Sequence, residues 1–132
     1  MKRFFLGTIL IIVGLLYIMS ANSYAQQKPA PYPLGLVADL TGRMSDMGTA
    51  IKRGMDIAID NVNAAGGVNG RQIKAFVYDG ESDPSKSVLH SKRLIEVDKA
   101  AILMGYNLSG ATMASIQTAE SGKTVLYSAS AS

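Results

Sequence analysis

The chain has 132 residues, of which 48% are hydrophobic, with one His and no Cys. This length allows one domain at most. The absence of Cys excludes a disulfide scaffold, an iron–sulfur cluster and a cysteine nucleophile, and a single His excludes a His-rich metal centre. The formal net charge of +3 falls to +1 once the first 25 residues are set aside, because 11 basic and 10 acidic side chains remain. A nearly neutral domain lacks the basic surface that binding to nucleic acid requires.

Residues 1–25 have the pattern of a secretory signal peptide. A start with two basic residues is followed by 16 uncharged, mostly apolar residues at 4–19. Ser23 and Ala25 then place small residues at the −3 and −1 positions of a cleavage site before Gln26. A permanent membrane anchor is the alternative, but the apolar run is shorter than the about 20 residues that span a bilayer. We therefore predict cleavage, and a mature protein that is periplasmic.

Beyond a Pro-rich lead-in at 26–33, which we expect to be mobile, the sequence alternates between strand and helix patterns. Short apolar runs predict strands, and longer segments with apolar residues on one face predict helices between them. The predicted strands are 34–38, 72–79, 100–104 and 124–127, and the predicted helices begin at Gly48, at Asp83-Pro84 and at Leu108. The order β-α-β-α-β-α-β indicates an α/β fold, part of a doubly wound parallel sheet with helices on both faces.

Two of these helices carry clear local signals. In the first, Ile51, Met55, Ala58 and Val62 recur at spacings of three and four, which predicts that they form the buried face. The second opens on Asp83-Pro84, because Asp is a good N-cap and Pro fits the first helical position.

Candidate binding residues follow the ends of the predicted strands. In an open parallel sheet, ligands bind beyond the carboxyl ends of the strands. Three loops leave such ends here, at 39–47, 106–110 and 128–132. The second loop runs into a helix N-terminus, where free N–H groups and the helix dipole favour a carboxylate or a phosphate. The Ser109 hydroxyl either donates a further hydrogen bond to such a ligand or caps its own helix, and the sequence leaves both open.

Enzyme chemistry has little support in the sequence. Asp79, Glu81 and Asp83 form an acidic cluster that would suit a calcium loop, but we expect Asp83 to cap a helix and the other two to face water. His90 lies within a predicted helix and has no carboxylate at helical spacing. No nucleophile–base pair and no cofactor loop is visible, so we expect neither catalysis nor a cofactor.

Several segments together resemble one protein family. The stretch from Ile59 to Arg71, IDNVNAAGGVNGR, is similar to a helix-to-strand signature of the branched-chain-amino-acid-type periplasmic binding proteins, which are the substrate receptors of ABC importers. Further matches are Tyr78 to Pro84, Leu40-Thr41-Gly42 with Met47-Gly48, and Leu126 to Ser132, so that the resemblance covers nearly all of 34–132.

The resemblance implies a two-lobed fold in which each lobe has a parallel sheet and the ligand is held between the lobes. On this basis residues 34–132 form about half of the N-terminal lobe. The family pattern assigns a hydroxyl donor to Ser109, with Asn107 and Gly110 in the same loop. It assigns ligand-binding backbone and hydroxyl groups to Ser130 and Ser132 after the fourth strand. Met47 takes a position where the family often has an aromatic residue near the ligand. The candidate ligand-binding residues are thus Met47, Asn107, Ser109, Gly110, Ser130 and Ser132.

These observations favour the extracytoplasmic solute-binding component of an ABC importer, with an amino acid or a similar small carboxylate or amide as ligand and a membrane permease as partner. The alternative is a ligand-sensing ectodomain of the same fold in a receptor or regulator. Because the second lobe would supply half of the ligand contacts, we expect the 132-residue chain to bind weakly or not at all. We also expect it to expose apolar faces and to aggregate readily.

Overall fold

The computed structural model describes residues 29–129, which form one parallel sheet flanked by helices. The sheet has four strands in the order β2-β1-β3-β4. The strands are β1 (Tyr32–Ala38), β2 (Ile73–Asp79), β3 (Ile102–Gly105) and β4 (Val125–Ser128), and the helices are α2 (Ser45–Ala64), α3 (Pro84–Glu96) and α4 (Ser109–Ser121). The predicted order of strands and helices and the α/β fold are confirmed. The predicted signal peptide and two of the candidate residues, Ser130 and Ser132, lie outside the described residues.

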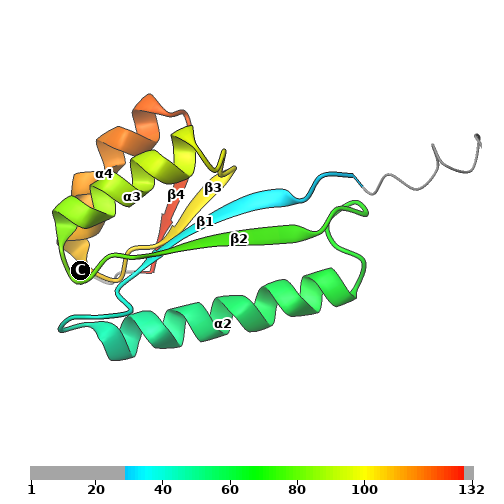
Figure 1. Cartoon of the computed structure of the whole chain (residues 1–132), viewed down its shortest axis with the longest axis horizontal. Helices are drawn as coiled ribbons and strands as arrows, with labels where there is room; N and C mark the ends of the chain where they lie inside the picture. The colour runs from blue at the N-terminus through cyan, green and yellow to red at the C-terminus, as the bar shows by residue number, and fades with distance from the viewer. Residues whose placement is uncertain (1–28, 130–132) are drawn as a thin grey trace, which may run out of the picture.

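The helices cover both faces of the sheet, with α2 on one face and α3 and α4 on the other (Figure 1). The chain passes from β1 to β2 on one side and then returns across β1 to reach β3 and β4. The strand order therefore reverses between β1 and β3. The carboxyl ends of these two strands form the switch point where open α/β sheets bind their ligands.

The first strand starts earlier than the sequence predicted. β1 begins at Tyr32 rather than Leu34, and Tyr32 pairs with Ile73 of β2. The Arg71 guanidinium lies 3.8 Å from the centroid of the Tyr32 ring and donates from Nε to the Ala30 carbonyl at 2.7 Å. The last residues of the predicted mobile lead-in thus belong to the sheet, because side-chain contacts with Arg71 hold them there.

Helix α2 also differs from its prediction, in its start and in its rotation. It begins at Ser45 rather than Gly48, and Ala58 and Val62 of the predicted buried face are exposed while Ile59 is half-buried. The reason lies at Gly48, where a Cβ atom would be 2.0 Å from the carbonyl oxygen of Asp39. This close backbone contact between the helix and the end of β1 fixes which side of α2 faces the sheet.

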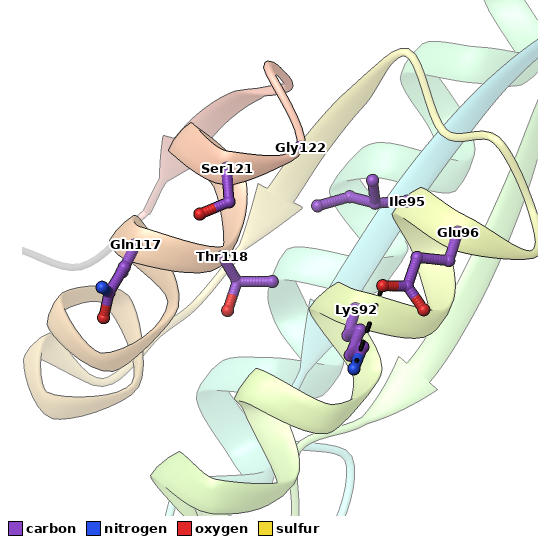
Figure 2. Close-up of a pocket in the computed structure, with 7 residues that line it drawn as sticks. All are labelled: Lys92, Ile95, Glu96, Gln117, Thr118, Ser121 and Gly122. Carbon is purple, nitrogen blue, oxygen red and sulfur yellow. Dashed lines mark ion pairs between the residues drawn. The ribbon is translucent and has the colours of Figure 1, made fainter.

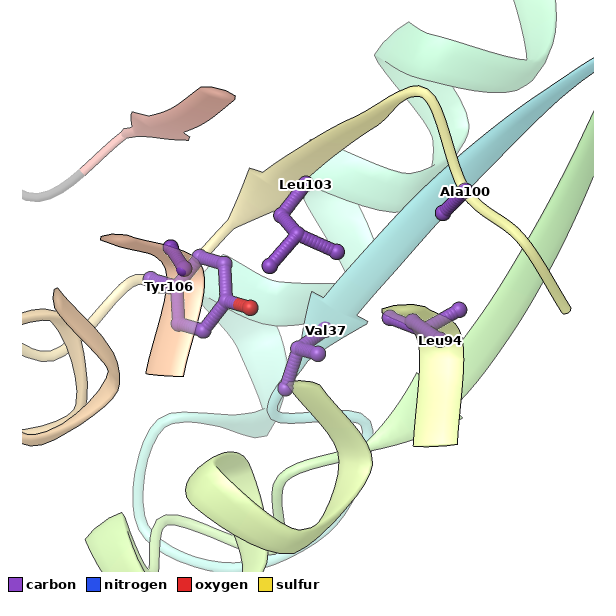
Figure 3. Packing of buried hydrophobic residues seen from close by; sticks show 6 residues of the cluster. Val37, Leu94, Ala100, Leu103 and Tyr106 are labelled. Carbon is purple, nitrogen blue, oxygen red and sulfur yellow. The ribbon is translucent and has the colours of Figure 1, made fainter. Parts of the chain in front are cut away.

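A cluster of buried hydrophobic residues lies between the sheet and the pair α3 and α4. Val37, Leu94, Leu103 and Tyr106 pack together there, and Figure 3 shows these side chains converging. On the opposite face α2 covers β1 and β2, whereas Val125 and Tyr127 of β4 are 63% and 61% exposed. Apolar surface is therefore exposed on this strand, as the sequence predicted. Among the described residues no helix has both the length and the apolar character needed to span a membrane.

Candidate functional site

Three helices start at the edge of the sheet where the strands end. β1 leads into α2, β2 into α3 and β3 into α4, so the three helix N-termini all lie at the carboxyl edge. Each N-terminus carries unpaired N–H groups and the positive end of a helix dipole. Which of them is available to an anionic ligand depends on whether the chain's own side chains already occupy it.

The start of α3 is closed by the chain itself. Asp83 is its N-cap and accepts a hydrogen bond from the backbone N–H of Ser85 at 2.8 Å, while Pro84 has no N–H to offer. The predicted cap is thereby confirmed. The start of α2 has an acidic residue, Asp46, in its first turn, which disfavours a second negative charge.

The start of α4 is open. Its N-cap residue is Leu108, no side chain of the described residues caps it, and its first turn has no acidic residue. The alternative in which Ser109 caps the helix is therefore wrong. The first amide groups of α4 have no partner within the helix, so this N-terminus suits a carboxylate or a phosphate.

Three of the candidate residues meet at this helix start. Ser109 is half-buried as the first residue of α4, Gly110 follows it, and Asn107 is in the preceding loop. A Cβ atom on Gly110 would lie 3.7 Å from the Pro84 ring, so the starts of α3 and α4 are neighbours. Met47 lies apart from these residues in sequence, in the first turn of α2, where it is 48% exposed.

Asn107 joins two of the loops at the switch point. Its side chain is 5% exposed, and its Oδ1 accepts a hydrogen bond from the backbone N–H of Asp39 at 3.1 Å. Its Nδ2 has no hydrogen-bond partner among the described residues. The amide thus holds the exit of β3 against the exit of β1, from a position shielded from solvent.

Asp39 was not among the residues predicted for the site. This residue follows β1 directly, is 3% exposed, and accepts a hydrogen bond at Oδ1 from the backbone N–H of Ser82 at 2.9 Å. With the Asn107 contact it connects the loops that leave β1, β2 and β3. A charged residue immediately after a buried strand was the signal available in the sequence.

Asp79 organises the first loop rather than facing water, so that expectation is wrong. It accepts hydrogen bonds from the Thr41 hydroxyl at 2.7 Å and from the backbone N–H groups of Leu40 and Glu81 at 2.9 and 2.8 Å. Burial raises the pKa of Asp79, but these hydrogen bonds outweigh it and hold the pKa below its ordinary value. In the described part of the chain, no three His, Asp or Glu side chains gather into a group that fits a metal ion.

A groove of about 540 Å³ lies elsewhere, between the C-terminal halves of α3 and α4 (Figure 2). Its lining includes Lys92 and Glu96, whose charged groups are 3.9 Å apart, together with Thr118 and Ser121. This groove is close to the negative ends of two helix dipoles, which disfavour a carboxylate. The open start of α4 remains the better place for an anionic group.

Comparisons with known proteins agree with this picture. Residues 31–132 match the family model described as periplasmic binding protein, and the chain belongs to that family. The resemblance stated from the sequence is thereby confirmed. An amino acid binding protein of Pseudomonas aeruginosa is 31% identical over 98 residues, which are 74% of this chain and 26% of that protein.

Solved structures give the same result. The branched-chain amino acid transporter substrate binding protein of Streptococcus pneumoniae, in complex with isoleucine, aligns with a TM-score of 0.75 and 30% identity over 77% of this chain and 29% of that one. A fatty acid ABC transporter substrate-binding protein of Thermomonospora curvata aligns with a TM-score of 0.71 and 30% identity over 76% of this chain and 25% of its own. The chain spans about a quarter of the length of these relatives. Their names describe binding proteins and not enzymes.

Proposed function

We propose that the chain forms the carboxylate-holding part of an extracytoplasmic solute-binding protein that serves an ABC importer. The ligand is a branched-chain amino acid or a similar small carboxylate or amide. The observation that carries the proposal is the uncapped start of α4 beside the switch point, with Ser109 as its first residue. Several relatives are named for amino acid ligands, and the Thermomonospora curvata neighbour is named for a fatty acid, so a carboxylate is the group that these ligands share.

The candidate residues then have distinct roles. The Ser109 hydroxyl and the first amide groups of α4, including that of Gly110, donate hydrogen bonds to the ligand carboxylate. Ser130 and Ser132, which come after β4, supply further backbone and hydroxyl groups. Met47 lies at the same edge of the sheet and packs near the ligand side chain.

The mechanism is capture followed by closure. A ligand docks at the carboxyl edge of this sheet, a second lobe closes over it, and the closed complex is presented to a membrane permease. In this proposal residues 1–25 direct export and are removed, and residues 34–132 are part of the first lobe. Because the closing lobe supplies the remaining contacts, binding by the 132-residue chain alone is weak. Of the two outcomes expected from the sequence, weak binding or none, the open start of α4 favours weak binding, with a dissociation constant near the millimolar range, about −4 kcal/mol.

An NMR titration of the isotope-labelled chain tests the proposal at this affinity. The ligands are L-leucine, leucinol, which lacks the carboxylate, and isocaproate, which lacks the ammonium. Leucine and isocaproate are expected to shift the amide signals of Ser109 to Ala111, and leucinol to leave them in place. Absence of shifts at millimolar leucine, or equal shifts with leucinol, would contradict the proposal.

A pair of serine variants makes the test specific. Ser109→Ala removes the hydroxyl at the open start of α4, and we expect it to weaken leucine binding by about three- to ten-fold. Ser85→Ala is the matched control, because Ser85 is exposed in the first turn of the capped helix α3. Equal effects of the two substitutions would argue against a site at α4.

A further inference from the structure

The loop before α4 contains an unusual turn. Gly105 has φ +105° and Tyr106 has φ +54°, so two successive residues are in the left-handed region. Gly105 is required there, since a Cβ atom would lie 2.1 Å from the carbonyl oxygen of Val37. Tyr106 has a bulky side chain in a conformation that such residues rarely adopt, and strain of this kind persists where the surroundings enforce it.

The side chain of Tyr106 is one of the groups that enforce the turn. It is 1% exposed, packs beside Leu103 and Val37 (Figure 3), and its hydroxyl lies 2.6 Å from the Ser91 hydroxyl on α3. Ser91 donates its own proton to the Ser87 carbonyl at 2.7 Å. The Tyr106 hydroxyl is therefore the donor in the pair, and it links the loop to the neighbouring helix.

The backbone of Tyr106 is held as well. Its N–H donates to the Val37 carbonyl at 2.8 Å, and its carbonyl accepts hydrogen bonds from the hydroxyls of Thr112 at 3.3 Å and Ser128 at 3.1 Å. Through these bonds and the Ser91 contact, this one residue is joined to β1, α3, α4 and β4.

The turn sets the conformation of the residues between it and α4. Asn107 comes next, and its amide is aimed at the Asp39 N–H, although this leaves Nδ2 without a partner among the described residues. The side chain that directly follows the turn is thus fastened to the exit of β1. Leu108 is then extended, with φ −114° and ψ 130°, and takes the cap position, which leaves Ser109 to open the helix.

We propose that Tyr106 is a positioning residue for the carboxylate site. Its left-handed turn, fastened to α3 by the bond from its hydroxyl to Ser91, holds Asn107, Ser109 and the uncapped start of α4 in binding geometry. The inference rests on the proposed function for its effect on ligand binding. The placement of the loop can be tested without any ligand.

The first experiment measures amide hydrogen exchange of the unliganded chain. Tyr106→Phe and Ser91→Ala break the same hydrogen bond from opposite sides. Each is expected to speed exchange by about three- to ten-fold at the hydrogen-bonded amides of Tyr106, Thr112 and Ala129, with no further increase in the double variant. Tyr78→Phe is the matched control, because it also loses one tyrosine hydroxyl bond, to Asp98 at 2.9 Å, away from this loop. It should leave the exchange rates of this loop unchanged.

The second experiment repeats the leucine titration with the same variants. Tyr106→Phe and Ser91→Ala should each weaken leucine binding by about five-fold, whereas Tyr78→Phe should have no effect. Exchange that rises equally along the whole chain, or a loop unaffected by both substitutions, would overturn the positioning role. If the unsubstituted chain fails to bind leucine, the proposed function is refuted, and the exchange experiment still decides whether Tyr106 holds the loop.

Discussion

Raising the pH through the alkaline range should destabilise the chain through Tyr106. Burial raises the pKa of Tyr106 from 10.0 to about 12. The unfolded chain releases this phenolic proton near pH 10, whereas the folded chain keeps it to about pH 12. The stability contributed by the protonated phenol is therefore fully present below pH 10 and is lost as the pH rises to about 12. The loss is at most about 2.7 kcal/mol, at about 1.36 kcal/mol per pKa unit.

Urea unfolding at a series of pH values between 9 and 12 measures this loss, with Tyr106→Phe as the reference. The unsubstituted chain is expected to lose about 2 kcal/mol more than the variant over this range. Subtracting the free energy of unfolding of the variant removes the contributions from the deprotonation of lysines and of Tyr78, which the two proteins share. The pKa of Tyr78 is also raised, chiefly by burial and by the hydrogen bond to Asp98. Parallel stability curves for the two proteins would refute the buried, protonated state assigned to Tyr106.

Two further substitutions test the contacts that shape the carboxyl edge of the sheet. Gly48→Ala should destabilise the chain by about 1–3 kcal/mol in urea unfolding, because the added Cβ would meet the Asp39 carbonyl at 2.0 Å. Gly54→Ala in the same helix meets no atom within 4 Å and should stabilise it by up to about 1 kcal/mol; the reverse order would contradict the packing of α2. The pKa of Asp79 is lower in the folded chain than in the unfolded chain. The ionised carboxylate therefore stabilises the fold at pH values above the ordinary pKa of aspartate, and this stabilisation is lost as the pH falls through the lowered pKa of the folded chain. Asp79→Asn should therefore lower stability at neutral pH and flatten its acid dependence, and an unchanged acid limb in unfolding experiments would show that the carboxylate does not hold the first loop.

The order of strands and helices could be read from the sequence because each signal is local. Asp83-Pro84 marks a helix start through two adjacent residues, and both hold their predicted positions. The rotation of α2 was not predictable in this way, since it depends on contact between Gly48 and the backbone of Asp39. Periodicity identifies a helix, but the facing strand decides which side is buried.

In the candidate site, too, local sequence signals predicted some features, whereas others depend on contacts between distant parts of the chain. Ser109 and Gly110 could be placed at a helix start because they come shortly after a predicted strand. Leu108 rather than Ser109 takes the cap position because of the left-handed turn at Tyr106. No local sequence pattern predicted this turn. The hydrogen bonds of Asp79 to the first loop span 38 and 39 residues, so they too could be seen only in the folded chain.

A crystal structure of this chain, determined at a saturating leucine concentration, is the most direct test of the proposed carboxylate site. We predict that the ligand carboxylate lies within hydrogen-bond distance of the Ser109 hydroxyl and of the first amide groups of α4. A carboxylate bound at the capped start of α3, or in the groove between α3 and α4, would refute the assignment of the site to α4.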